Sequence, residues 1–236
     1  MKAAIPNALT LTNLFFGAVA ILCLIYGHLE AAIWLVGVAV LADFLDGAVA
    51  RWLHVSSPLG RELDSLADVV SFGLFPGVIF YGLIAAASTD GSWPSQLTIV
   101  GLPAFVLSAF AAFRLGQFNL DERQHSSFIG LPTPAMTLLS VGLLIWFQEK
   151  IYPALFYPPV LYAVIALLAW LMNANIPMFS FKFKSFRWKG NEIKYIFAAI
   201  SVMLLVVLKS IAIAWIVLLY IGLSVSLIFF KGKRSI

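Results

Sequence analysis

Five of the eleven acidic residues of this chain lie in one stretch, DFLDGAVARWLHVSSPLGRELDSLAD, residues 43–68. Asp43 and Asp46 are three residues apart, which places them on one face of a helix. Asp64 and Asp68 are four residues apart and share one face of the next helix. Because a short link makes the two helices antiparallel neighbours, the four carboxylates are expected to converge between them.

Four clustered carboxylates repel one another, so a cation must offset their charge. Ligands that are all oxygen suit Mg²⁺, Mn²⁺ or Ca²⁺. Two such ions about 3.5–4 Å apart would match four carboxylates and would clamp a phosphoryl group. Gly47, Ala50 and Gly60 leave room beside the carboxylates, and Arg51 could pair with a phosphate. The same small residues would also let two membrane helices pack closely.

The elements that carry these residues have the composition of membrane-spanning segments. The chain has 236 residues, of which 62% are hydrophobic and 11% charged, and its mean hydropathy is +0.98. A soluble domain carries about 25% charged residues. We predict an all-α integral membrane protein with about eight transmembrane helices, at 11–27, 31–53, 63–87, 97–118, 133–149, 156–175, 193–209 and 211–230.

The eight spans would form a single membrane domain, 1–236. Residues 1–175 would make a six-helix catalytic core and 193–230 an additional C-terminal hairpin. With the N-terminus in the cytoplasm, all of the 15 basic residues except Lys150 and Lys209 fall on the inner side. The positive-inside rule therefore predicts that both termini and the carboxylate cluster face the cytoplasm, in the inner or plasma membrane.

The acidic stretch resembles the signature of the CDP-alcohol phosphotransferase family at every fixed position: Asp43-x2-Asp46-Gly47-x2-Ala50-Arg51-x8-Gly60-x3-Asp64-x3-Asp68. The resemblance implies transfer of a phosphatidyl group from a CDP-linked lipid to an alcohol, with release of CMP. It also implies that Asp43, Asp46 and Asp64 hold one divalent metal and that Asp43, Asp64 and Asp68 hold a second. Asp68 would in addition be the general base.

The same resemblance implies a CDP-lipid site and a homodimer. Gly47, Arg51 and Ser57 would line the lipid site. The segment Pro6-Asn7-Ala8-Leu9-Thr10 is similar to the family's N-terminal donor-binding stretch, which adds Pro6, Asn7 and Thr10.

Three further segments resemble the phosphatidylserine synthase branch of this family: Ser71-Phe72-Gly73, FRLGQFN (113–119) and FIGLPTPA (128–135). They imply CDP-diacylglycerol as donor and L-serine as acceptor. Arg114 and Asn119 could contact the serine carboxylate and ammonium, although Arg114 could equally be an inner-side topology anchor. Glycerol 3-phosphate, inositol phosphate and choline stay open as acceptors, and the basic segment 182–189 could bind their phosphates.

The sequence bears on two other kinds of function. Intramembrane carboxylates also build divalent-cation transporters, but here the carboxylates occupy only one end of their helices. A transport path would need polar groups that continue across the membrane. Nucleic acid is not an expected partner, because the basic residues flank hydrophobic spans; the basic segment 182–189 is better explained as an inner-side loop facing membrane lipids.

Overall fold

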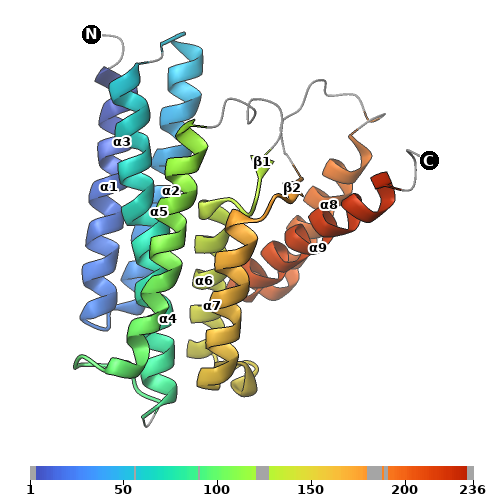
Figure 1. The fold of residues 1–236 in the computed structure, drawn as a ribbon. Helices are drawn as coiled ribbons and strands as arrows, with labels where there is room; N and C mark the ends of the chain where they lie inside the picture. The colour runs from blue at the N-terminus through green and yellow to red at the C-terminus, as the bar shows by residue number, and fades with distance from the viewer. Residues whose placement is uncertain are drawn as a thin grey trace.

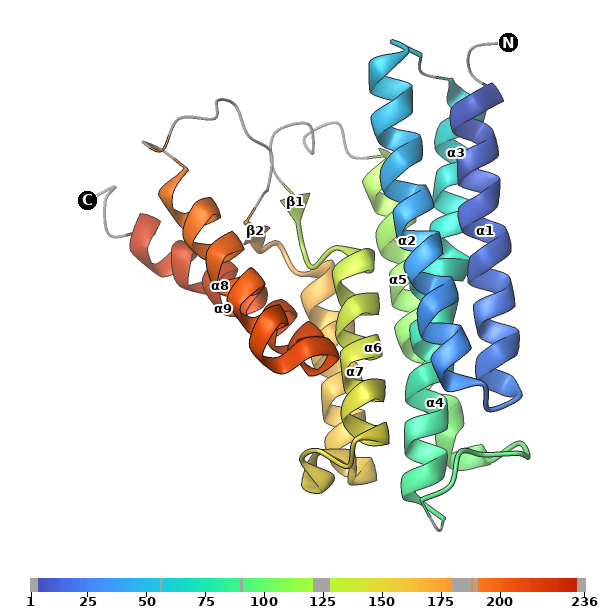
Figure 2. The same cartoon turned by 180° about the vertical axis from the view of Figure 1, so that it is seen from behind.

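The computed structural model is a bundle of long helices (Figure 1). It describes residues 4–55, 57–89, 91–120, 128–179, 188 and 191–232. Helices α1, α2 and α5 stand beside the continuous segment that α3 and α4 form end to end, and α6 and α7 pack against this group. Helices α8 and α9 form a hairpin that is inclined to the rest (Figure 2).

The elements follow one another in this order: α1 (Ala4–Ile25), α2 (Leu29–Trp52), α3 (Pro58–Asp68), the π-helix η1 (Val69–Leu74), α4 (Phe75–Ala87), the 3₁₀-helix η2 (Ile99–Ala104), α5 (Phe105–Leu120), β1 (Phe128–Ile129), α6 (Thr133–Gln148), the 3₁₀-helix η4 (Pro153–Phe156), α7 (Pro158–Asn173), β2 (Pro177–Met178), α8 (Glu192–Leu208), the 3₁₀-helix η5 (Lys209–Ile211) and α9 (Ala212–Gly232). The two short strands pair antiparallel.

The predicted all-α membrane architecture is confirmed. Among the described residues, five helical segments are long and apolar enough to cross a membrane: 4–25, 29–52, 58–87, 99–120 and 192–227. Helices α6 and α7 have 16 residues each, about 24 Å at 1.5 Å per residue. The protein is thus a multi-pass membrane protein, and the count of eight spans stays a prediction.

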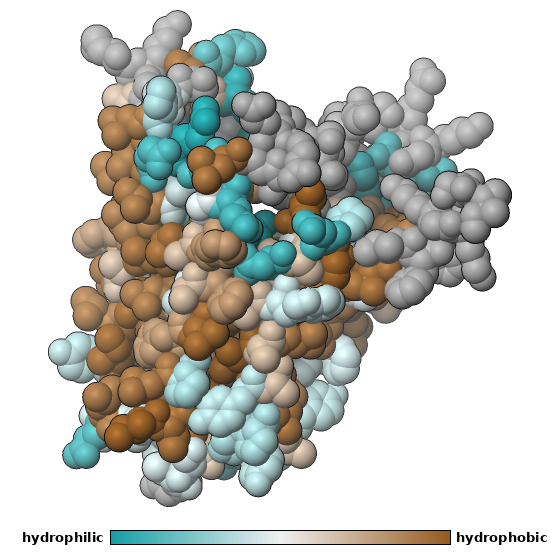
Figure 3. All heavy atoms as spheres, in the orientation of Figure 1, coloured by the Kyte–Doolittle hydropathy of each residue, from teal (hydrophilic) through white to brown (hydrophobic). Residues whose placement is uncertain are grey.

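The continuous helical segment α3–η1–α4 is the centre of the bundle. In its most apolar window 78% of the residues are buried, against 33% or less in the other long segments. Phe72, Phe75 and Phe80 are fully buried along it. The surrounding helices expose large apolar side chains such as Trp34 and Phe44, as lipid-facing helices do. Figure 3 shows hydrophobic residues over most of this face, with hydrophilic ones gathered toward one end.

The π-helix η1 follows Asp68 directly and is fixed by three hydroxyl groups. Ser71 donates to the carbonyl of Asn13 in α1 at 3.1 Å. Ser108 of α5 donates to the carbonyl of Gly73 at 2.9 Å, and Thr137 of α6 donates to that of Phe72 at 3.3 Å. π-Helical turns inside α-helices often occur at functional sites. Here three neighbouring helices hold the turn that follows the predicted general base.

Two predicted helix starts were wrong. The first helix begins at Ala4 rather than near residue 11, because Pro6 lies in the first turn, where its missing N–H costs nothing. The third begins at Pro58 rather than 63, because Ser57 caps it by accepting the N–H of Gly60 at 3.0 Å. Hydropathy alone missed both starts, since each first turn is weakly apolar or polar.

The predicted break between the last two helices is present. Lys209 has a φ of 52°, so the chain turns there and α9 packs against α8 and α6. The indole N–H of Trp146 in α6 donates to the carbonyl of Ile211 at 3.0 Å. Gly142 of α6 lies against Ala214, and a Cβ at Gly142 would approach the Ala214 nitrogen to 2.5 Å.

Gly142→Ala should therefore loosen the contact between α6 and α9. Overpacking a tight contact costs about 1–3 kcal/mol, so the midpoint of thermal unfolding in detergent should fall. Gly222→Ala is the matched control, because, apart from its own helix backbone and chain neighbours, no heavy atom of the described chain lies within 4 Å of the added Cβ. Equal midpoints for the two variants would contradict the close α6–α9 contact.

Candidate active site

Three of the four signature aspartates converge between α2 and α3. Asp43, Asp64 and Asp68 each offer a carboxylate oxygen, and these atoms all lie within 4.8 Å of one another. The carboxyl groups of Asp43 and Asp68 are within hydrogen-bonding reach. All three side chains are half-buried. The convergence that helix spacing predicted is thus present for these three residues.

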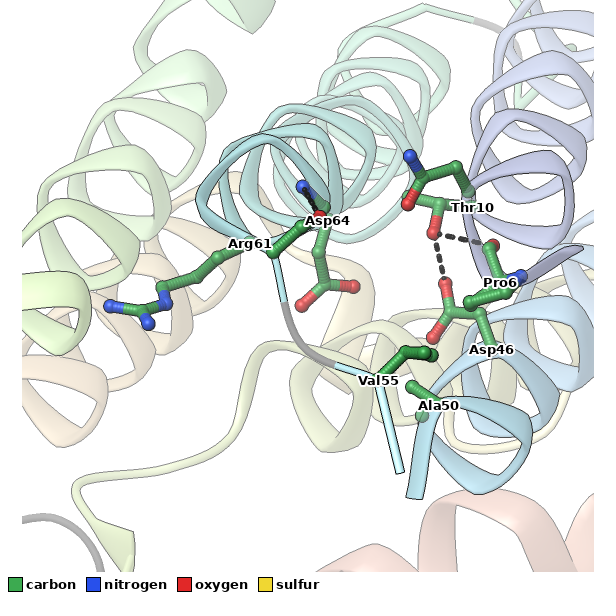
Figure 4. Close-up of a pocket in the computed structure, with 11 residues that line it drawn as sticks. Pro6, Thr10, Asp46, Ala50, Val55, Arg61 and Asp64 are labelled. Carbon is green, nitrogen blue, oxygen red and sulfur yellow. Dashed lines mark hydrogen bonds between the residues drawn. The ribbon is translucent and has the colours of Figure 1, made fainter. Parts of the chain in front are cut away.

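Asp46 is not part of this trio, although it lines the same pocket and interacts electrostatically with Asp43 and Asp64. It is 7% exposed, and its Oδ2 accepts a hydrogen bond from the Thr10 hydroxyl at 2.6 Å. The same hydroxyl lies 3.1 Å from the carbonyl of Pro6 (Figure 4). One Asp46 oxygen is therefore held by α1. The structure groups Asp46 with the N-terminal residues more closely than the signature spacing alone suggested.

Asn13 is a site residue that sequence reasoning missed. It is fully buried, and its amide nitrogen lies 3.4 Å from Oδ1 of Asp68, a long hydrogen bond. Its own Oδ1 has no protein partner. The signal was available in the sequence, because Pro6, Thr10, Asn13 and Gly17 follow the helical spacing i, i+4, i+7, i+11. All four are buried on the face of α1 that meets the site.

The predicted CDP-lipid residues gather in a small pocket of about 190 Å³ where α1, α2 and α3 meet (Figure 4). In that view Asp46 and Asp64 flank the cavity, and Arg61 points away from Thr10. Of the predicted residues, five line this pocket and Arg51 lines the adjacent one: Pro6, Asn7, Thr10, Gly47 and Ser57.

Gly60 and Gly47 keep this pocket open. A Cβ at Gly60 would come within 3.0 Å of both the Asn7 side-chain oxygen and the Ser57 hydroxyl. A Cβ at Gly47 would come within 3.3 Å of a guanidinium nitrogen of Arg51. Small residues are therefore needed where these polar groups crowd together.

A second pocket of about 670 Å³ joins the carboxylates to α5 and the start of α6. It is lined by all four signature aspartates and by Arg51, Arg61, Arg114, Asn119 and residues 132–134, among others. The amide of Asn119 donates to the Ser65 hydroxyl at 2.8 Å, which ties α5 to α3. Both predicted acceptor residues thus lie on the wall of the pocket that holds the carboxylates.

Arg114 is a buried cation rather than a surface one. Its side chain is 7% exposed, and its Nε has no hydrogen-bond partner. It interacts electrostatically with Asp68 across the pocket. Buried polar groups are nearly always hydrogen-bonded, so a donor without a partner on a pocket wall favours a ligand-binding role over a topology anchor.

The trio fits a hard divalent cation. Three carboxylate oxygens within 4.8 Å of one another are the type of ligand set that Mg²⁺ and Mn²⁺ take. A cation would also offset the repulsion among the three charges. Asp43, Asp64 and Asp68 are the residues that would hold it, with Asp46 nearby on the pocket wall.

Comparison with known sequences agrees with this geometry. Residues 3–179 match the model of the CDP-alcohol phosphatidyltransferase family. The chain belongs to this family, whose members use divalent metals.

Its relatives include enzymes that use serine. The chain is 32% identical over 180 residues to the CDP-diacylglycerol–serine O-phosphatidyltransferase of Bacillus subtilis, which covers 75% of this chain and 91% of that protein. It is 32% identical to the enzyme of the same name from Helicobacter pylori, over 75% of this chain and 72% of the relative. It is also 36% identical to archaetidylserine synthase from Methanothermobacter thermautotrophicus, over 62% and 60%.

Replacing single aspartates should separate metal binding from proton transfer. Asp43→Asn and Asp64→Asn should lose metal-dependent binding of the CDP-lipid as well as turnover, with partial rescue at high metal concentration. Asp68→Asn leaves the predicted first-metal ligands Asp43, Asp46 and Asp64 in place, so it should keep lipid binding. It should lose turnover by about 10²–10⁴-fold, the usual cost of removing a general base. Donor binding and CMP release would be measured at several metal concentrations. Substantial turnover by Asp68→Asn at saturating metal and serine would mean that another group takes the proton.

Proposed function

We propose that the protein transfers the phosphatidyl group of CDP-diacylglycerol to the hydroxyl of L-serine, giving phosphatidylserine and CMP. The larger pocket is the main support for the proposal, because it combines the carboxylate trio with a buried arginine whose Nε has no hydrogen-bond partner. The names of the Bacillus and Helicobacter relatives support the same donor and acceptor. In this proposal the acyl chains of the donor stay in the bilayer, and serine enters the active site from water.

The donor would lie across both pockets. Its nucleotide end would contact Asn7, Thr10 and Ser57 in the small pocket, and its pyrophosphate would face Arg51. Two divalent ions, Mg²⁺ or Mn²⁺, with Ca²⁺ able to bind, would be held by the four aspartates and would supply neutralisation of the pyrophosphate and of the leaving CMP. The side chain of Phe44, exposed beside the pocket, gives the acyl chains an apolar path to the bilayer.

The reaction would be a single displacement at phosphorus. The serine hydroxyl oxygen forms the new P–O bond to the phosphatidyl phosphorus while the bond from that phosphorus to CMP breaks. Asp68 accepts the hydroxyl proton as the attack proceeds. The buried amide of Asn13 holds one Asp68 oxygen, which would leave the other oxygen for the proton.

The charges of the larger pocket suit a zwitterionic acceptor. Among the described residues that line it are four carboxylates and three arginines. Serine adds no net charge, and its carboxylate would pair with Arg114. An acceptor with a phosphate would add about two negative charges. The predicted phosphate-binding segment 182–189 lies outside the described residues apart from Trp188, so the described wall favours serine.

An acceptor panel with purified protein tests the proposal. CDP-diacylglycerol and a divalent metal would be supplied with serine, glycerol 3-phosphate, inositol phosphate or choline, and both CMP and the lipid product would be measured. Of these four acceptors, only serine should give rapid CMP release. Release with another acceptor only would assign the same chemistry to a different alcohol. Absence of CMP release with every acceptor, together with metal uptake into vesicles, would favour a cation transporter, which residues 69–87 argue against because they contain no charged side chain.

We also propose that the active-site end of the bundle faces the cytoplasm and that the protein is a homodimer of the inner or plasma membrane. In a Cys23→Ala background, Glu62→Cys should react with an impermeant maleimide only after cells are opened. Ser95→Cys, at the far end of the α3–α4 segment, should react in intact cells. Both positions are exposed. Labelling of Glu62→Cys from outside would invert the topology.

Arg114→Ala should raise the KM for serine while the KM for CDP-diacylglycerol stays nearly the same. Loss of a charge-assisted hydrogen bond costs about 1.5–3 kcal/mol, roughly a tenfold to hundredfold change. Initial rates at varied serine and varied donor would separate the two constants. Arg187→Ala, in the basic segment 182–189 of the sequence, is the control for a general loss of positive charge. An unchanged serine KM in Arg114→Ala would remove this residue from the acceptor site.

A further inference from the structure

The C-terminal hairpin holds the chain that follows β2. Phe179 comes directly after this strand, and both of its backbone polar groups bond to side chains of α9. Its N–H donates to the Ser224 hydroxyl oxygen at 3.1 Å, and its carbonyl accepts from the Tyr220 hydroxyl at 3.1 Å. Tyr220 and Ser224 are one helical turn apart and both are buried. We call the antiparallel pair β1–β2 the ribbon. One face of α9 therefore holds the end of this ribbon.

The ribbon in turn leads to the wall of the larger pocket. Strand β2 pairs with β1, and both lie between α5 and the α8–α9 hairpin (Figures 1 and 2). After β1, Gly130 donates its N–H to Ile176 and Leu131 donates to Leu171, each at 2.9 Å. The next residues, 132–134, line the pocket. A displacement of the ribbon would therefore move this wall.

Tyr220 does not line the larger pocket, but it lies close enough to affect Arg114 on the pocket wall. Its hydroxyl group interacts electrostatically with Arg114. Its ring is held by Phe197 of α8, with ring centroids 6.4 Å apart, and Phe197 contacts Phe179 at 6.3 Å. The phenol is thus fixed by aromatic packing against Phe197 and by the hydrogen bond from its hydroxyl group to the Phe179 carbonyl.

We propose that Tyr220 is a positioning residue for the acceptor, which makes the C-terminal hairpin part of the active site rather than only an additional membrane anchor. Its phenol fixes the ribbon end that sets the 132–134 wall, and it sets the surroundings of the Arg114 guanidinium. The inference rests on the proposed function in that it takes the Arg114 side of the pocket as the acceptor site. The family match ends at residue 179, so this role belongs to a part of the chain beyond the shared core.

Tyr220→Phe removes the hydroxyl and keeps the ring. We expect the serine KM to rise about threefold to tenfold, the effect of one hydrogen bond, with the donor KM and the thermal unfolding midpoint unchanged. Tyr162→Phe is the matched control. The Tyr162 hydroxyl also ties a helix to a backbone carbonyl, that of Val100 at 2.6 Å, but it does not line either pocket. This variant should leave both KM values as in the wild type.

A double variant tests whether Tyr220 acts through the acceptor site. In an Arg114→Ala background, Tyr220→Phe should add little further rise in serine KM, because the group that it helps to place is gone. An unchanged serine KM in Tyr220→Phe, or an equal rise in the serine and donor KM with a lower unfolding midpoint, would overturn the inference. Failure of the wild type to use serine would count against the proposed function instead; the same comparison would then be made with the acceptor that the protein does use.

Discussion

Mutual repulsion of carboxylates inside an apolar bundle is the constraint on which this structure depends. Two unit charges 4.8 Å apart repel by about 3 kcal/mol at an effective dielectric constant of about 20, and Asp43, Asp64 and Asp68 lie within that distance of one another. A chain that is 62% hydrophobic offers few groups to offset this cost. A divalent cation among the carboxylates would offset this repulsion, and it would also neutralise a pyrophosphate donor. The same cation would therefore stabilise the folded bundle and take part in the proposed reaction.

The polar groups around the cluster show how the bundle limits this cost. Thr10 and Asn13 reach from α1 to the aspartates. The hydroxyl groups of Ser71, Ser108 and Thr137 donate hydrogen bonds to backbone carbonyls in or beside the π-helix. In a medium of low dielectric each such bond is stronger, and each unmade one is more costly. These hydroxyl groups therefore fix the backbone directly after Asp68, where the π-helix interrupts the regular α-helical hydrogen bonds.

The carboxylate cluster could be predicted from the sequence, but the contacts from neighbouring helices that support it could not. The spacing of Asp43, Asp64 and Asp68 depends only on helical period and a short link, so their convergence could be predicted. The contact between Asn13 and Asp68 spans two helices, and hydropathy says nothing of it. The π-helix likewise depends on partners in α1, α5 and α6. The offset of Asp46 toward Thr10 could not be foreseen, because the predicted helix began after the segment that contains Pro6.

The two sides of the site differ in how they must handle charge. The donor side is built from small residues and side-chain oxygens, which suits a ligand whose apolar part stays in lipid and whose negative charges meet cations. The proposed acceptor side carries the buried Arg114 guanidinium, whose Nε has no hydrogen-bond partner, and leaving this donor unbonded is costly unless a ligand accepts from it. A buried cation needs a rigid surrounding, since a flexible wall would admit water and weaken its selectivity for a small carboxylate. The ribbon lies inside the family match and α9 lies beyond it, and together they would supply such a wall. The proposed acceptor site would then be shaped partly by the shared core and partly by a later helix.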